Sequence, residues 1–242
     1  MLRGRTLVES VGPVGPDPDG PFAALLAVAH SCGLPLDLHL GPLPAPDDAR
    51  DRDRLTALLD RLPTGSLLTV AGALPRSAVA ALGAAADRVG VVVLPQGGCG
   101  AGASGPGGFD AATARRLADA GVPLAAGSGA LRDVTRPVGR ADPIEAAFLL
   151  AAQAGLSAAA AYDAVGPGAR ARLGLPACAV EAGRPADLLA LRGETLVAAL
   201  SGGHSRVVLH AGRVVSRTSA VREYADTTTA AVPRQVRPSR PA

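Results

Sequence analysis

The chain has 242 residues and a mass of 23.9 kDa, with 48% apolar and 19% charged residues. A chain of this kind buries a sizeable core, and its apolar content excludes long disorder. No run of about 18 uncharged apolar residues occurs, which excludes a membrane-spanning helix. Arg3 and Arg5 lead into Pro- and Gly-rich sequence without the apolar stretch of a secretory signal, so we expect a cytoplasmic protein.

The sequence contains no lysine, so arginine supplies all of its positive charge at pH 7. The formal net charge is +3. The excess comes from Arg234, Arg237 and Arg240, which lie in a terminal stretch without acidic residues. Flanking prolines and the lack of aromatic residues predict that residues 225–242 form a solvated, disordered tail, and we expect no nucleic-acid or membrane partner.

The three cysteines, Cys32, Cys99 and Cys178, are far apart and odd in number. This spacing argues against a disulfide framework and against a Cys-x-x-Cys metal site. We expect them to be incidental thiols.

Strand and helix patterns alternate along the first two thirds of the chain. Strands are expected at residues 5–10, 35–40, 66–71, 89–94 and 122–126, and helices at residues 21–31, 48–62, 75–88, 110–120 and 144–154. Asp142 is expected to cap the helix that starts at Ile144, and Ser157 a further short helix that ends near Ala164.

This alternation predicts parallel strands joined by right-handed crossovers. The strands lack a clean polar alternation, so both faces of the sheet are expected to be buried. Two architectures satisfy the pattern: an open doubly wound sheet, or part of a closed (β/α) barrel. A closed barrel needs eight strand–helix units, and only five precede the change of pattern after Gly168.

The later part of the chain carries a more specific pattern. The segment Val180–Leu191, which contains Gly183-Arg-Pro-Ala-Asp-Leu188, and the later segment Arg206–Val215 resemble the close of amidohydrolase-superfamily proteins. Four earlier segments resemble the fifth to eighth strands of that family in order: Pro35–His39, Leu68–Gly72, Val91–Pro95 and Gly121–Ala130. Residues 133–146 and 207–224 are similar to the pattern of cytosine deaminases.

The resemblance implies a partial TIM-like (β/α) barrel of about five βα units over residues 1–176. It implies that residues 177–224 form a short β-hairpin and strands of the family's β-sandwich. About three barrel units of the family have no counterpart here, so we expect a barrel-like arc with a gap and exposed sheet edges. Such edges invite pairing, and we expect self-association or a separately encoded partner chain.

The family uses a metal ion to generate hydroxide, and its ligands are a His-x-His, further histidines at the fifth and sixth strands, and an aspartate at the eighth. Only His39 matches this set. Gly72 and Gly129 occupy the sixth- and eighth-strand positions, and Pro42 replaces a fifth-strand acid. One imidazole does not hold Zn or Fe, because catalytic sites use about three protein ligands. We therefore expect no cofactor and interpret His39 as a vestigial or partial ligand.

Two hypotheses of function remain. In the first, the chain is a cytosine-deaminase-like protein that is impaired or inactive as it stands and has no confident catalytic residue. In the second, it is an active hydrolase that acts on a C–N bond of a cyclic amidine or amide. The second hypothesis requires Zn or Fe, with Asp133 in the metal position or a His-x-His from a partner chain.

Three other features of the sequence give weaker indications of function. Residues 97–102 form a Gly-rich stretch that lacks a following Lys-Ser/Thr, which favours an ordinary loop over a phosphate site. Cys99 has no neighbouring base in the sequence and is expected to be a spectator thiol. Residues 202–205 are expected to form a turn, and His30 to face polar atoms at a helix end.

Overall fold

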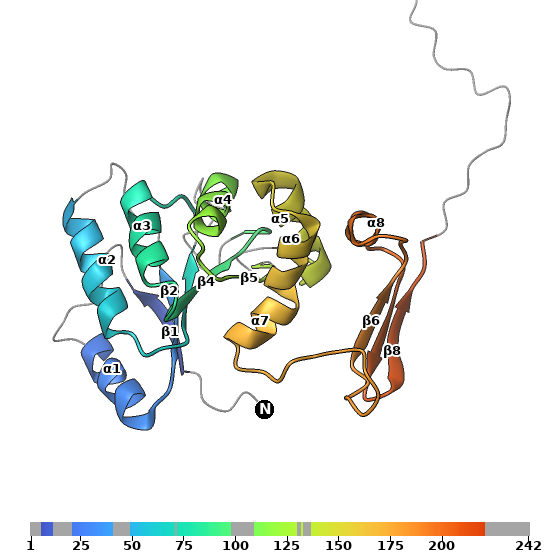
Figure 1. The fold of residues 1–242 in the computed structure, drawn as a ribbon, viewed down its shortest axis with the longest axis horizontal. Helices are drawn as coiled ribbons and strands as arrows, with labels where there is room; N and C mark the ends of the chain where they lie inside the picture. Colours follow the sequence, from blue (N-terminus) through green and yellow to red (C-terminus); the bar gives the residue numbers. More distant parts are fainter. Residues whose placement is uncertain are drawn as a thin grey trace, which may run out of the picture.

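The computed structural model describes residues 6–11, 21–40, 49–70, 72–97, 109–129, 132 and 137–220. Its first part is a five-stranded parallel sheet with the strand order β1-β2-β3-β4-β5 (Figure 1). The strands are β1 (Thr6–Val11), β2 (Leu36–Leu40), β3 (Ser66–Val70), β4 (Val89–Val93) and β5 (Leu124–Ala126). The order follows the chain without the reversal that marks a doubly wound sheet.

Helices follow the strands, and from the second helix to the seventh each one contacts the next in chain order (Figure 1). They are α1 (Pro21–Cys32), α2 (Ala49–Arg61), α3 (Arg76–Ala84), α4 (Ala111–Asp119), α5 (Pro143–Ala154), α6 (Ala158–Val165) and α7 (Pro167–Arg172). Every strand and helix expected in this part of the chain is present, and Asp142 and Ser157 cap α5 and α6 as predicted. The sequence patterns did not predict α7, because its six residues span less than two helical turns and show no helical periodicity.

The core lies between the sheet and these helices. Leu36, Leu38 and Leu40 of β2 are at most 6% exposed, whereas Asp37 and His39 between them are half-buried on the opposite face. All five residues of β3 are buried, which confirms that the central strand is covered on both faces. Buried Ser66 accepts a hydrogen bond from the Leu36 backbone N–H at 3.0 Å and so ties β2 to β3.

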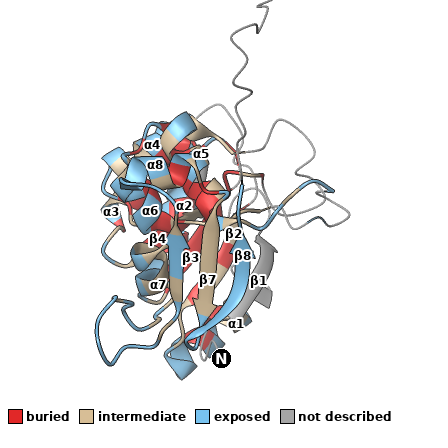
Figure 2. Cartoon of the chain, turned by 90° about the vertical axis from the view of Figure 1, so that its right-hand side faces the viewer, coloured by how far each residue is buried: buried red, intermediate tan, exposed pale blue. Residues whose placement is uncertain are grey.

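The second part of the structure is a three-stranded antiparallel sheet of β6 (Leu188–Leu191), β7 (Arg206–His210) and β8 (Arg213–Thr218). A short helix, α8 (Leu196–Ser201), connects β6 to β7 and was not predicted. The expected turn at residues 202–204 follows it. Strand β8 is exposed along its whole length (Figure 2).

Asp187 of the Ala-Asp-Leu motif has a structural role in this sheet. Its Oδ1 accepts a hydrogen bond from the Ala211 backbone N–H at 2.8 Å and lies 2.9 Å from Nδ1 of His210. The Ala211 N–H holds the pKa of Asp187 below its usual range, and the neighbouring His210 adds to this effect. The motif thus fixes the turn of the β7–β8 hairpin.

An ion pair fastens the antiparallel sheet to α5. Nη1 and Nη2 of Arg206 donate to the two carboxylate oxygens of Asp142 at 2.9 and 2.7 Å. Asp142 also caps α5 by accepting from the Ile144 N–H. Burial alone raises the pKa of Asp142, but the hydrogen bonds and charge of Arg206, with the helix N–H groups, outweigh it and lower this pKa. The Asp142 carboxylate therefore both caps α5 and holds the antiparallel sheet against this helix.

No helix in the described part of the chain is long and apolar enough to cross a membrane. The predicted tail at residues 225–242 lies outside the described residues, and the division near residue 176 stays a prediction.

Replacing Asp142 with Asn should lower the free energy of unfolding at pH 7 by about 1–3 kcal/mol, because the cap is kept while the charged pair is lost. The folded-state pKa of Asp142 is lowered, so its contribution is full above the unfolded-state pKa of about 3.9 and is lost as the pH falls through the folded-state value. Urea denaturation at several pH values measures this difference.

The matched control is Asp119→Asn, which removes the exposed partner of Arg115 and should cost less than about 1 kcal/mol. A difference between wild type and Asp142→Asn that stays constant from neutral pH down to about pH 2 would contradict the role given to the carboxylate.

Candidate functional site

The carboxyl ends of the parallel strands meet in one row. Leu40, Val70, Val93 and Ala126 stand side by side in register across β2 to β5. Functional groups of open and closed parallel sheets gather at this edge. His39 lies one residue before the row, half-buried and next to Thr69 of β3, where the sequence placed it. Within the residues that the structure describes, its ring makes no hydrogen bond.

Gly72 and Gly129, which stand where the resemblance leads us to expect further ligands, cannot be replaced by residues with side chains without strain. Gly72 is buried and has φ +85°, a left-handed conformation that a histidine adopts only at a cost. Gly129 has φ +70°, and a Cβ built there overlaps the carbonyl oxygen of Gly97 and lies 2.9 Å from Cβ of Leu94. The backbone after β4 therefore fills the space that a carboxylate at position 129 needs.

The donor set does not fit a metal ion. No group of three His, Cys, Asp or Glu side chains comes together among the described residues. His39 supplies one imidazole, and neither glycine supplies a donor. Asp133, Pro42 and Cys99 lie outside the described residues, so the predictions made for them stay open.

The other three histidines lie at a helix end, in a turn and in a hairpin. Nε2 of His30 lies 2.8 Å from the carbonyl oxygen of Arg61, which confirms that it faces polar atoms at a helix end. His210 pairs with Asp187 in the hairpin. His204 lies in the turn before β7 and lines a small hollow of about 200 Å³ between α5 and α8.

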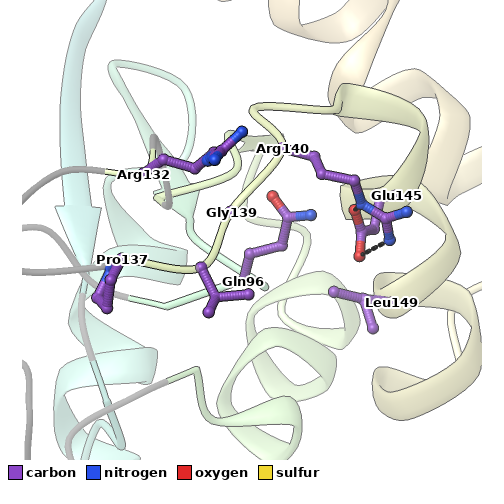
Figure 3. Close-up of a pocket in the computed structure, with 8 residues that line it drawn as sticks. Gln96, Arg132, Pro137, Gly139, Arg140, Glu145 and Leu149 are labelled. Atoms are coloured by element: carbon purple, nitrogen blue, oxygen red, sulfur yellow. Dashed lines mark hydrogen bonds and ion pairs between the residues drawn. The ribbon is translucent and has the colours of Figure 1, made fainter.

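A larger hollow of about 620 Å³ opens beyond the carboxyl ends of β4 and β5 (Figure 3). Its lining combines polar and apolar side chains: Gln96, Arg132, Pro137, Val138, Gly139, Arg140, Glu145 and Leu149. The sequence patterns did not predict it, because the lining comes from three separate segments. The hint of this hollow in the sequence is Gln96, a polar residue that follows shortly after the buried strand β4.

Backbone contacts fix the position of Gln96 in this hollow. Its backbone N–H donates to the carbonyl oxygen of Ser128 at 3.2 Å, and the Gly127 N–H donates to Val93 at 3.1 Å. Gly129 also approaches Gly97 closely between the same two loops. The two loops thus hold each other and present Gln96 to the hollow.

The charges around the hollow are partly neutralised. Arg140 donates two hydrogen bonds to the carboxylate of Glu145, at 2.9 and 2.7 Å, and this carboxylate raises the pKa of Arg140 (Figure 3). Arg132 lies on the other side of Gln96 and makes no ion pair with any described residue. The described lining therefore carries one uncompensated positive charge.

Comparison with solved structures identifies the fold. The chain is similar to N-isopropylammelide isopropylaminohydrolase from Burkholderia multivorans, with a TM-score of 0.60 and 24% identity over 81% of this chain and 50% of that one. It is also similar to a mutant of atrazine chlorohydrolase TrzN from Arthrobacter aurescens, complexed with zinc and atraton. There the TM-score is 0.52 and the identity 21%, over 88% of this chain and 50% of that one.

The chain therefore shares its fold with these two hydrolases. This confirms, as a likeness of fold, the resemblance that covers most of residues 5–224. The chain spans about half the length of each of these two structures. No family model and no curated protein sequence matches it.

Replacing Gly129 with Ala should lower the free energy of unfolding by about 2–5 kcal/mol, because a left-handed residue and an overlap with Gly97 add together. Gly33→Ala is the matched control. Gly33 has φ +63° and nothing within 4 Å of a built Cβ, so its variant should lose only about 1–2 kcal/mol. Chemical denaturation of both variants gives the comparison, and equal losses would show that the two loops are not in close contact.

Proposed function

We propose that the chain is a cytosine-deaminase-like protein of amidohydrolase fold that binds a small cyclic amide or amidine and does not hydrolyse it alone. The observation that carries this proposal is the backbone contact at Gly129. Hydrolysis by this fold requires a metal ion with about three protein ligands and an open position for water. His39 would supply one such ligand, and the carbonyl oxygen of Gly97 lies where a side chain at position 129 would begin.

The proposal includes the arrangement of the chain. We propose that residues 1–176 form an open arc of a (β/α) barrel, residues 177–224 strands of a composite sandwich, and residues 225–242 a basic tail, in a cytoplasmic protein. The uninterrupted order of five parallel strands supports the arc, since barrels keep sequential order.

A second candidate is an active hydrolase of C–N bonds whose ligand set is completed by a partner chain or by Asp133. The similarity of fold to two solved hydrolases is the observation that favours it. This candidate requires Zn or Fe, whereas the first requires no cofactor.

Metal content separates the two candidates. After incubation with Zn²⁺ or Fe²⁺ and dialysis, the purified chain should hold well under one ion per molecule by elemental analysis, and it should not release ammonia from cytosine. One imidazole gives too little affinity to retain an ion. Stoichiometric metal that is lost in His39→Ala and kept in the matched variant His30→Ala would contradict the first candidate and favour the active hydrolase.

We further propose that the chain self-associates through unpaired sheet edges. Within the described residues β1 pairs only with β2, β5 only with β4, and β8 only with β7. Val214 and Val215 of the edge strand β8 are 53% and 59% exposed. Exposed edges with apolar side chains recruit further strands.

Light scattering over a range of concentrations should therefore give a mass above the 23.9 kDa of one chain. Val215→Lys should shift the protein toward the monomer, because a charged side chain on an edge strand opposes pairing. Val180→Lys, at a site that is 87% exposed but outside any strand, is the matched control and should have no effect. A monodisperse monomer at every concentration would end this proposal.

A further inference from the structure

The small hollow of about 200 Å³ between α5 and α8 lies where the antiparallel sheet meets α5. Its most deeply buried lining residues are apolar, since Ile144 and Leu200 are each 5% exposed. Phe148 stands one turn after Ile144 on α5, also lines the hollow, and is 42% exposed. Small-molecule sites usually measure about 300–1,000 Å³, so this hollow indicates an occupant of the size of one side chain.

The lining also offers a polar group to its occupant. The ring of His204 lines the hollow, and no hydrogen bond joins it to another described residue. The charged side chains of the lining are already paired with one another: Arg140 with Glu145, and Arg206 with Asp142. A side chain with an apolar body and a polar tip therefore matches this hollow better than a charged one.

The last described residues bring the chain to the edge of this hollow. Thr218, at the end of β8, pairs with Arg206, which lines the hollow. The backbone N–H of Ala220 donates to Oγ of Ser205 at 3.1 Å, and Ser205 lies between two lining residues, His204 and Arg206. In Figure 1 this end of β8 lies at the level of α8. The chain that follows Ala220 therefore starts beside the hollow.

We infer that Tyr224 of this chain occupies the hollow, with its ring against Phe148 and its hydroxyl group bonded to the ring of His204. The sequence of residues 221–226 is Val-Arg-Glu-Tyr-Ala-Asp, and the tyrosine is its one aromatic residue. Four residues extend to about 13–14 Å, so the connection from Ala220 is long enough for the ring to turn back into a hollow that begins at the adjoining strand. The inference goes beyond the proposed function, because neither metal nor substrate enters it.

The chemistry of the ring supports this occupant. Aromatic pairs attract each other beyond the effect of their buried area, and a buried tyrosine usually gives its hydroxyl group a partner. Docking of the Tyr224 ring also removes the exposed surface of Phe148 from water. The opposing cost is the ordering of a short segment, and Ala220 before it is already held by Ser205.

The docked ring has a role at the junction between the antiparallel sheet and α5. The ion pair of Arg206 with Asp142 borders the same hollow. A tyrosine in the hollow covers this pair and adds a second attachment between the sheet and α5. The segment after β8 thereby holds the two parts of the structure together.

Tyrosine fluorescence tests the inference, because the chain has no tryptophan and two tyrosines, Tyr162 and Tyr224. In the full chain with Tyr162→Phe, all tyrosine emission comes from Tyr224. Its acrylamide quenching constant should be at least about threefold lower than that of N-acetyltyrosinamide, because the hollow screens the ring. Phe148→Ala in this background should raise the constant at least about twofold, since the ring loses its aromatic partner. The matched control Val28→Ala changes an exposed helical residue outside the lining and should leave the constant unchanged.

Ser201→Leu replaces Phe148→Ala if circular dichroism shows the latter to be unfolded. Ser201 is exposed and lines the hollow, so leucine there fills the space without removing a core side chain. It should expose Tyr224 to the same extent. Quenching of Tyr224 as strong as that of the free amide would overturn the inference, as would unchanged quenching in a folded variant. Protection that is lost on dilution would also overturn it, because the tyrosine of a second copy would then occupy the hollow.

Discussion

The contact between the loops after β4 and β5 determines what this molecule can do. Gly129 lies against the carbonyl of Gly97, and the same pair of loops carries the hydrogen bond between Gln96 and Ser128. Close backbone packing at this place leaves no room for a carboxylate and holds a carboxamide at the edge of the hollow. The lack of a metal donor at position 129 and the position of Gln96 beside the hollow thus have one physical origin.

Much of the fold was predictable because it follows from short-range patterns. Buried strands such as β3 and β4 are continuous apolar runs, and Asp142 and Ser157 stand directly before apolar helices as caps do. The short helices α7 and α8 escaped prediction, since six residues provide less than two helical turns. The strand order could be determined only from the structure, because hydrophobic periodicity does not reveal which strands are neighbours.

The candidate site was predictable only in part. Motif spacing placed His39 at the end of β2 and exposed the missing ligands at Gly72 and Gly129. The reason that Gly129 excludes a side chain is the position of Gly97, more than thirty residues earlier in the chain. The hollow was missed for the same reason: Gln96, Arg132 and Glu145 are unremarkable in sequence and meet only in three dimensions.

The bond between Asp142 and Arg206 has a consequence for biosynthesis. The two residues are 64 positions apart, so Asp142 leaves the ribosome well before its partner is made. During that interval Asp142 can act only as the cap of α5, through the Ile144 N–H. The two hydrogen bonds that join the antiparallel sheet to α5 form only after β7 has been made.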